Sequence, residues 1–382
     1  MMRSFVFLLT LLLTIPVFAQ DEEGPASARG ASVDKTGKGY TSAYVVEPKS
    51  GRVLFAENED EALPTASMAK MMTLLITLEE IAAGNLQWDT PVTVSAHASR
   101  MGGSQVYLRA ASVWPVKNLV IATMVHSAND AAMALAEKIA GSSDAFADMM
   151  NRRAKELGLT NSRFFDPHGL PADTPGQENV MSAEDLAKLG MELMKHPFMR
   201  QLAVIPEMEF RNGTLARIYN PNRLVNPKRP EYYPEATGIK TGYSGPAGYS
   251  ITASAKRGDM ELIAVVTGAR SPSGAQSSFG IARRLFNEAF QGHRMVTPVK
   301  KGAVVGQAAV TDGRAEAVQA VAAEDVSAIV KRGEADNVQV NFQGQAVTAP
   351  VKQGQQVGVV VVTSGSETIA RVPALAATGV DK

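Results

Sequence analysis

The segment 68–83 restricts the fold of this chain more than any other, because it predicts a helix that is apolar on nearly every side. It is rich in Met, Leu, Ile, Ala and Glu, which favour helix, and Gly84 is a typical stop. Apolar residues cover most of the helix circumference, at Met71, Met72, Leu74, Leu75, Ile76 and Leu78. A helix of this kind must be covered by other elements rather than lie on a surface. We therefore expect it at the centre of a domain.

Ser67 and Lys70 stand at the start of this helix. Residues three apart on a helix share a face, so the Lys70 amine can reach the Ser67 hydroxyl. Burial would favour the neutral amine, which can accept the serine proton. The alternative is a lysine that extends to solvent beside a capping serine, and this is the usual case for an isolated motif. The same spellings recur at 32–35 and 35–37, in a polar stretch without apolar periodicity, where we interpret them as chance matches.

A second polar string, Ser127-Ala128-Asn129, lies between two predicted helices. The apolar stretch 113–125 predicts the first, and 131–140 predicts the second, which ends at Gly141. Ser and Asn at such a junction have two interpretations. They cap free backbone amides, or they project into a cleft.

The third string, Lys240-Thr241-Gly242, precedes two β-prone runs, 248–255 and 260–267, joined by a polar turn at 256–259. This pattern predicts a β-hairpin. We place Lys240 and Thr241 at the start of its first strand, pointing along the strand edge. Gly242 would allow a substrate to approach the backbone closely. The alternative is a lysine in solvent at a strand end.

Each of the three strings falls on the type of element that its chemistry requires, and further stretches extend the pattern, namely 102–104, 155–161, 166–170, 247–249 and 253–255. On these residues, 39–295 resembles the low-molecular-mass penicillin-binding proteins, specifically the serine-type D-Ala-D-Ala carboxypeptidases. The resemblance implies an α/β (α+β) fold: a β-lactamase/transpeptidase-like domain with an antiparallel sheet flanked by helices. It also implies a peptidase that removes the terminal D-Ala from peptidoglycan pentapeptide stems and that β-lactams inhibit covalently, with no cofactor and no metal.

The resemblance also assigns catalytic roles. It implies that Ser67 is the acylating nucleophile, that Lys70 is its base, and that Ser127 relays a proton to the leaving D-Ala nitrogen. The backbone amides of Ser67 and Tyr243 correspond to the oxyanion hole. Donors of this kind are worth about 10²–10³ in rate each.

Substrate binding is implied at four further positions. Asn129 would hydrogen-bond the peptide group of the substrate, and Lys240 and Thr241, followed by Gly242, would hold its carboxylate. The expected partners are stem peptides ending in D-Ala-D-Ala and β-lactam antibiotics.

The chain departs from the family where enterobacterial members have a carboxylate-binding arginine, because ungapped alignment from Lys240 places Ala275 there. Arg270 lies nearby and can equally be structural. The proline-rich segment 220–233, which carries Arg223, Lys228 and Arg229, is an alternative source of positive charge at the rim of the cleft.

Two other functions stay open. A peptidoglycan-binding scaffold with weak turnover would fit Ala275. A serine β-lactamase would need a glutamate base before the third motif, but Glu178 stands directly beside Asn179, without the spacing of those enzymes. Without that base a penicilloyl-enzyme should persist.

Composition agrees with an exported protein of about two domains. The 382 residues include 38 basic and 38 acidic ones, so nothing indicates nucleic-acid binding, and no cysteine is present. The histidines have no metal-like spacing, and we interpret His126 and His168 as structural residues near the cleft. Residues 1–19 have the pattern of a signal peptide with Gln20 as the mature start, which predicts a periplasmic or envelope location. Residues 20–38 read as a flexible linker.

Short alternating apolar runs after Met295, at 304–310, 326–330, 338–342 and 357–362, predict that 296–382 forms a small β-rich domain with a tail. In the resemblance it matches the C-terminal β domain of these carboxypeptidases. The family usually ends in an amphipathic anchoring helix, but 369–382 contains Pro373 and no aromatic residue. A weak peripheral contact of this domain with the membrane or with an envelope protein remains as an alternative.

Overall fold

The computed structural model describes residues 38–172, 174–210 and 216–382. The predicted signal peptide at 1–19, the predicted linker up to residue 37 and the second copies of the motifs lie outside the described residues.

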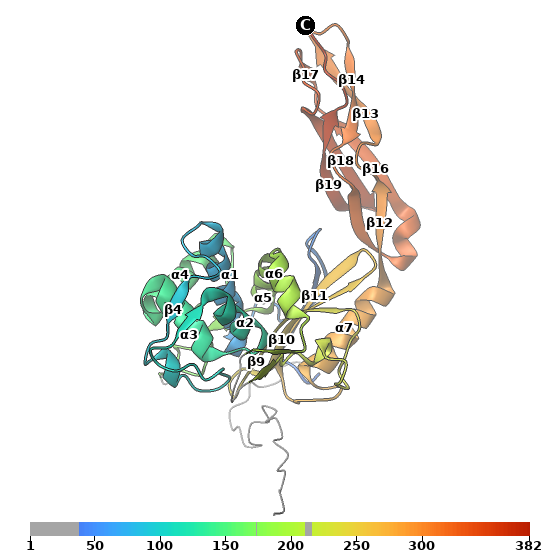
Figure 1. Ribbon diagram of the computed structural model, residues 1–382. Helices are drawn as coiled ribbons and strands as arrows, with labels where there is room; N and C mark the ends of the chain where they lie inside the picture. The colour runs from blue at the N-terminus through green and yellow to red at the C-terminus, as the bar shows by residue number, and fades with distance from the viewer. Residues whose placement is uncertain (1–37, 173, 211–215) are drawn as a thin grey trace, which may run out of the picture.

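A five-stranded antiparallel sheet forms the centre of the first domain, in the order β2-β1-β11-β10-β9 (Figure 1). Its strands are β1 (Ser42–Glu47), β2 (Arg52–Glu57), β9 (Ala236–Ser244), β10 (Gly248–Arg257) and β11 (Met260–Ala269). Strands β10 and β11 form the expected hairpin, closed by a turn at Gly258. Strand β9 ends the sheet, so one of its edges is not paired within it.

The prediction that Lys240 begins the first strand of this hairpin is wrong. Lys240 lies in the middle of β9, a separate strand that pairs with β10 in register Lys240↔Thr252. The polar residues Lys240 and Thr241 interrupt the apolar pattern of 236–244, and a second turn follows at Gly245-Pro246. The pattern therefore does not indicate a separate strand at this place.

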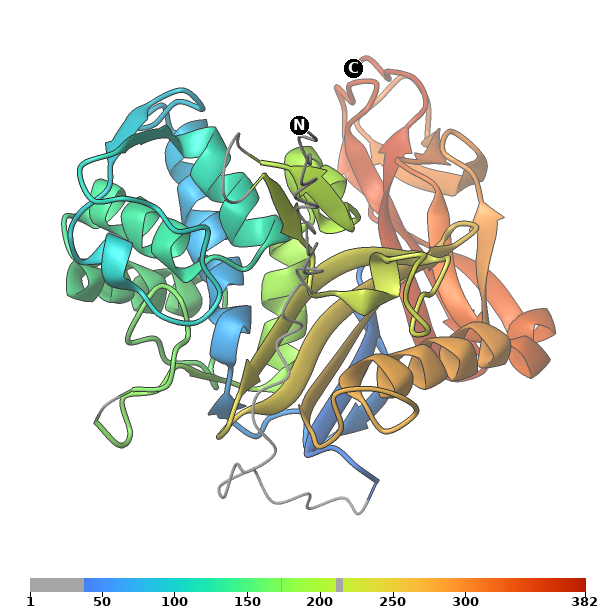
Figure 2. The same cartoon turned by 60° about the horizontal axis from the view of Figure 1, so that its bottom comes forward.

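Helices cover both faces of the sheet. Helix α7 (Ser278–Gly292) packs against β10 and β11 on one face, and α5 (Ala183–Leu193) packs against β1 and β11 on the other. Figure 2 shows α7 in orange along the sheet and the blue-to-green helices gathered on the other side. That group also contains α1 (Lys70–Ala82), α2 (Val116–Val125), α3 (Asn129–Ala140), α4 (Ser143–Glu156) and α6 (Pro197–Ala203).

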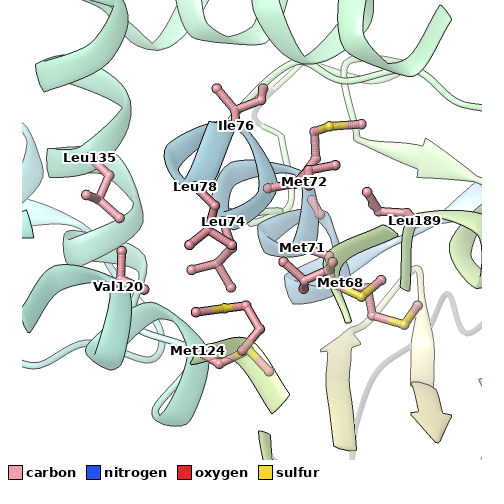
Figure 3. Packing of buried hydrophobic residues seen from close by; sticks show 14 of the residues in the cluster. Met68, Met71, Met72, Leu74, Ile76, Leu78, Val120, Met124, Leu135 and Leu189 are labelled. Carbon is pink, nitrogen blue, oxygen red and sulfur yellow. The ribbon is translucent and has the colours of Figure 1, made fainter. Parts of the chain in front are cut away.

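Helix α1 occupies the centre of this helical group, as its sequence predicts. Met71, Met72, Leu74 and Leu75 are fully buried, and Figure 3 shows side chains of α1 packed against Val120 and Met124 of α2, Leu135 of α3 and Leu189 of α5. Each buried side chain of this size contributes about 1.5–3 kcal/mol relative to exposure. The first turn differs from the expectation, because Ala66–Ala69 forms a 3₁₀ turn (η1) and the α-helix begins at Lys70.

The expected helix over 113–125 is wrong in its first residues. Val113–Pro115 forms β5, which pairs with β4 (Pro91–Thr93), and α2 begins at Val116. Pro115 disfavours helical backbone at Trp114, so the helix cannot extend back beyond the proline. The helix predicted over 131–140 is confirmed as α3, which is followed by Gly141 with a φ of 83°.

Apart from the 3₁₀ helix η4 (Arg332–Asn337), the regular structure of the C-terminal part is β. Strand β12 (His293–Val299) follows α7 and pairs with β15 (Val326–Lys331). A six-stranded sheet has the order β16-β18-β19-β14-β13-β17, with bounds Val338–Gly344, Gln356–Ser364, Glu367–Ala376, Ala317–Ala322, Val304–Thr311 and Val347–Thr348. In Figure 1 this part extends from the end of α7, with the chain terminus at its far tip.

Three strands of this sheet, β14, β17 and β19, were absent from the sequence expectation, and β17 is only two residues long. Strand β14 is half alanine, which favours strand weakly. Strand β19 contains Pro373, which lies opposite Val359 of β18 just before pairing with β14 begins at Ala374. A proline is tolerated there because no ladder bond is needed on that side.

Arg52 of β2 ties the two domains together. Its guanidinium donates to the Ile329 carbonyl at 2.9 Å and pairs with Glu367 at 2.9 Å. Over the ranges that the structure describes, no helix combines the length and the apolar character needed to cross a bilayer.

Candidate active site

Ser67 and Lys70 meet as their spacing predicts. Lys70 Nζ lies 2.7 Å from Ser67 Oγ and 2.7 Å from the backbone carbonyl of His168. Lys70 is fully buried, whereas Ser67 is half-buried and keeps access to solvent. Ala66 precedes the serine with a φ of 45°, so the backbone enters the 3₁₀ turn through a left-handed residue. The alternative of a lysine extending to solvent is wrong.

Ser127 and Lys240 form a second hydroxyl–amine pair. Lys240 Nζ donates to Ser127 Oγ at 2.8 Å, and the residue is 2 % exposed. The alternative of a lysine in solvent at a strand end is therefore wrong. Ser127 lies between α2 and α3 with a φ of 60°. The N-cap residue of α3 is Ala128, with no side-chain cap bond, so neither polar side chain of this junction caps the helix.

Asn129 is anchored by the loop of Gly102 and Gly103. Its Nδ2 atom donates to the Gly102 carbonyl at 2.8 Å, and its backbone amide donates to the Ser104 carbonyl at 2.7 Å. A Cβ on Gly103 would lie 2.8 Å from Asn129 Nδ2, which explains why glycine is needed there. The Oδ1 atom is buried and has no hydrogen-bond partner among the described residues.

The two pairs lie at one place because β9 packs directly on η1. A Cβ added at Gly242 would lie 2.6 Å from the Thr65 carbonyl oxygen and 3.3 Å from the Ala66 Cβ. Only glycine lets the strand that carries Lys240 come this close to the turn that carries Ser67. The three strings therefore converge along one junction between the sheet and the helical group.

Thr241 and Tyr243 alternate with Lys240 and Gly242 along β9. Both are half-buried, and the Tyr243 ring stacks on Tyr249 of β10 with centroids 4.3 Å apart. Because β9 ends the sheet, alternate backbone amides along it face away from β10. The free edge can therefore present amides to a bound carbonyl.

Sequence reasoning missed Asp130, which follows the second string. Its carboxylate is fully buried and accepts the amides of Val106, Leu108 and Ala131 at 3.1, 2.9 and 2.9 Å. Burial raises the pKa of Asp130, and the amide bonds offset only part of that effect. Asp130 thereby holds in place the loop that contacts Asn129. In the sequence, this role was indicated by the position of Asp130 directly after Asn129.

The expected sources of positive charge differ in their placement. Arg223 lies in the 3₁₀ turn η3 (Arg223–Val225), with Nη1 3.3 Å from the Pro272 carbonyl and 3.5 Å from Glu231. This arginine ties segment 220–233 to the loop before α7. Arg270 is exposed, and its backbone amide donates a hydrogen bond to the Gly39 carbonyl. Ala275 packs against Gly280 at the start of α7.

Comparison with known proteins agrees with this architecture. Residues 33–271 match the family model described as D-alanyl-D-alanine carboxypeptidase, and residues 293–382 match that of the penicillin-binding protein 5 C-terminal domain. D-alanyl-D-alanine carboxypeptidase DacF of Bacillus subtilis is 32 % identical over 372 residues, covering 96 % of this chain and 92 % of the relative. DacC of Escherichia coli is 34 % identical over 341 residues, covering 87 % and 82 %.

Solved structures show the same fold. Penicillin-binding protein 5 of Haemophilus influenzae has a TM-score of 0.77 at 26 % identity, covering 90 % of this chain and 98 % of that one. A peptidoglycan synthesis regulatory factor (PBP3) of Streptococcus pneumoniae has a TM-score of 0.79 at 26 % identity, covering 90 % and 99 %.

An antiparallel sheet between helices, followed by an all-β domain, is the fold of the low-molecular-mass penicillin-binding proteins, as expected from the sequence. The chain belongs to the D-alanyl-D-alanine carboxypeptidase family and is a serine hydrolase.

Proposed function

We propose that this protein removes the terminal D-Ala from peptidoglycan stem peptides through an ester on Ser67. The observation that carries the proposal is the pair of hydroxyl–amine contacts, Ser67 with Lys70 and Ser127 with Lys240, on opposite sides of the β9–η1 junction. A nucleophile next to a buried amine, and a second hydroxyl held by another amine, are the parts that acyl transfer requires.

In the acylation step Ser67 Oγ attacks the carbonyl carbon of the penultimate D-Ala, and its proton passes to Lys70. The backbone amides of Ser67 and Tyr243 receive the developing oxyanion. When the C–N bond breaks, Ser127 delivers a proton to the departing D-Ala nitrogen and takes one from the Lys70 ammonium, so Lys70 is neutral again before the next step. Water then attacks the ester with Lys70 as base, the ester bond breaks, and Ser67 Oγ recovers its proton.

Substrate binding follows from the atoms left available along this junction. Asn129 Oδ1, which has no partner in the described ranges, can accept an N–H of the stem peptide, which would run along the free edge of β9. Thr241 would hydrogen-bond the terminal carboxylate, with Lys240 providing charge. The space beside Gly242 is filled by η1, so this glycine serves the packing of β9 on η1 and not, as expected from the sequence, the approach of a substrate.

The loop before the third motif argues against a β-lactamase. Among the described residues of this loop, the His168 carbonyl contacts Lys70, and the Asn179 side chain is bound to Asp166 and Phe165. A backbone carbonyl cannot take a proton from water as a glutamate does. A penicilloyl ester on Ser67 should therefore be long-lived. The scaffold alternative is disfavoured because two hydroxyl–amine contacts suited to acyl transfer are both present.

Release of D-Ala from a synthetic peptide ending in D-Ala-D-Ala tests the function. The wild type should release D-Ala, and Ser67→Ala should not, whereas the matched control Ser99→Ala should behave as the wild type because the Ser99 hydroxyl donates to the Ala96 carbonyl within its own turn. Labelling by a fluorescent penicillin without any D-Ala release would favour the scaffold alternative. We also place the protein in the periplasm or cell envelope, and N-terminal sequencing that begins at Gln20 would support this.

A further inference from the structure

A single turn, Asp166-Pro167-His168-Gly169, contacts the backbone and the side chains on both sides of Ser67. The His168 carbonyl accepts from Lys70 Nζ at 2.7 Å, and the Pro167 carbonyl accepts from Thr73 Oγ1 at 2.6 Å. Gly169 has a φ of 80°, and a Cβ there would lie 1.9 Å from the Ala66 carbonyl oxygen. The turn therefore packs against the backbone of Ala66, directly before Ser67. It also accepts a hydrogen bond from Lys70, three positions after Ser67.

Two side chains outside the sequence-predicted site hold this turn in shape. Asp166 Oδ1 accepts the amides of His168 and Gly169 at 2.7 and 2.5 Å. Asn179, which is 2 % exposed, accepts the Phe165 amide at 2.6 Å and donates to the Asp166 carbonyl at 3.0 Å. The Asn179 carbonyl also accepts the Thr65 amide at 2.9 Å, which links the turn to the strand entering η1.

Asp166 is suited to hold such a turn because it is ionised. Burial opposes its ionisation, but His168 Nδ1 at 2.9 Å and the two amides outweigh burial and hold the pKa of Asp166 below its ordinary value. Hydrogen bonds to a charged acceptor are about twice as strong as those between neutral groups. The His168 carbonyl is thus fixed by the residue two positions before it.

The position of that carbonyl matters for the chemistry of Lys70. A neutral amine has two N–H bonds and one lone pair, so donation of one N–H to the His168 carbonyl sets the rotation of the amine. The lone pair is then available to Ser67 Oγ, at 2.7 Å. Once Lys70 has accepted the serine proton, the same carbonyl stabilises the ammonium through a charge-assisted bond.

We propose that Asp166 and Asn179 are positioning residues for acyl transfer, which act by holding the His168 carbonyl against Lys70 and the Gly169 backbone against Ala66. The inference rests on the proposed roles of Ser67 and Lys70. Neither residue touches the reacting carbonyl, so their loss should slow the chemical step without weakening substrate binding. A misplacement of about 1 Å at a reacting group can cost about 10²-fold in rate.

The test compares acylation by a fluorescent penicillin in the full-length chain, followed by stopped flow to separate the initial dissociation constant from the acylation rate constant. Asp166→Ala and Asn179→Ala should lower the acylation rate constant by about 10- to 100-fold with an unchanged dissociation constant. Asp166→Asn should recover most of the rate, because its amide oxygen can accept the same two backbone amides.

Asn151 provides a matched control. Its side chain accepts the Phe164 amide at 2.9 Å and donates to the Phe164 carbonyl at 2.7 Å, so it holds the same segment two residues earlier without contacting the turn. Asn151→Ala should lower thermal stability but leave the acylation rate constant unchanged. If Asp166→Ala does not fold, Asp166→Ser replaces it, because a serine hydroxyl can retain one of the two amide bonds.

The outcomes are distinguishable. If the wild type is labelled and Asp166→Ala or its replacement acylates at the wild-type rate, the inference is overturned while the proposed function stands. Equal losses of rate in Asn151→Ala and Asp166→Ala would also overturn it, since they would indicate a general structural effect. A wild type that penicillin does not label would overturn the proposed function itself.

Discussion

Lys240 Nζ lies 2.8 Å from Ser127 Oγ, although the two residues are 113 positions apart and belong to different halves of the first domain. The contact joins the terminal strand of the sheet to the junction between two helices. Ser67 and Lys70 lie on the turn against which the same strand packs. The candidate active site is therefore an interface between the sheet and the helical group.

Removal of the Lys240 amine should disable the site with little effect on the fold. In Lys240→Ala, Ser127 loses its donor and the carboxylate of the substrate loses a nearby positive charge, so kcat/KM for D-Ala release should fall by about 10²-fold or more. Lys256→Ala, on the exposed end of β10, is the matched control and should leave kcat/KM unchanged. A Lys240→Ala variant with wild-type kcat/KM would contradict the role of this amine.

Gly242→Ala should separate β9 from η1. The added Cβ would lie 2.6 Å from the Thr65 carbonyl oxygen, so strand or turn must shift, at about 1–3 kcal/mol. We expect a lower melting temperature together with a loss of penicillin labelling. Gly292→Ala is the control, because a Cβ at the end of α7 meets nothing within 4 Å. Full labelling of Gly242→Ala would show that the close approach is not required.

The free energy that Asp130 contributes to stability should fall as the pH rises through the raised pKa of this residue. Burial raises that pKa above the ordinary value, so the native state binds the proton more tightly than the unfolded chain. The stabilisation that comes from protonated Asp130 is thus fully present below the ordinary aspartate pKa. It is lost as the pH rises through the pKa of Asp130 in the native state. Chemical unfolding of the wild type and of Asp130→Asn over acidic pH measures it.

The difference in unfolding free energy between the two proteins should change with pH in this window by at most about 1.4 kcal/mol per pH unit. Exposed carboxylates contribute equally to both proteins and cancel in this difference. Asp148→Asn, on the solvent side of α4, serves as the control for loss of a carboxylate. A pH-independent difference between wild type and Asp130→Asn would contradict the raised pKa.

The sequence was most informative where function depends on side chains in short runs. Ser67, Lys70, Ser127 and Asn129 could each be placed because an apolar pattern around their strings indicated the element that carries them, whereas Lys240 was recognised by its string but assigned to the wrong strand. That patterning also predicted the central position of α1 and the β10–β11 hairpin.

Other parts could not be predicted, for physical reasons. The His168 carbonyl is a backbone atom, and any residue could supply it, so no side-chain pattern marks its approach to Lys70. Strand β9 was missed as a strand because its functional residues are polar, and strand β19 because Pro373 interrupts its pattern. Asp166 and Asn179 lie 13 positions apart in a segment without periodicity, and only the folded loop brings them together.

The nucleophile and the lifetime of its ester can both be read by peptide mass spectrometry of the protein after brief exposure to penicillin, repeated over time after removal of free drug. We expect the penicilloyl mass on the peptide that contains Ser67, its absence in Ser67→Ala, and slow loss of the ester. An adduct on another residue would contradict the assigned nucleophile, and its disappearance within seconds would contradict the absence of a dedicated deacylating base.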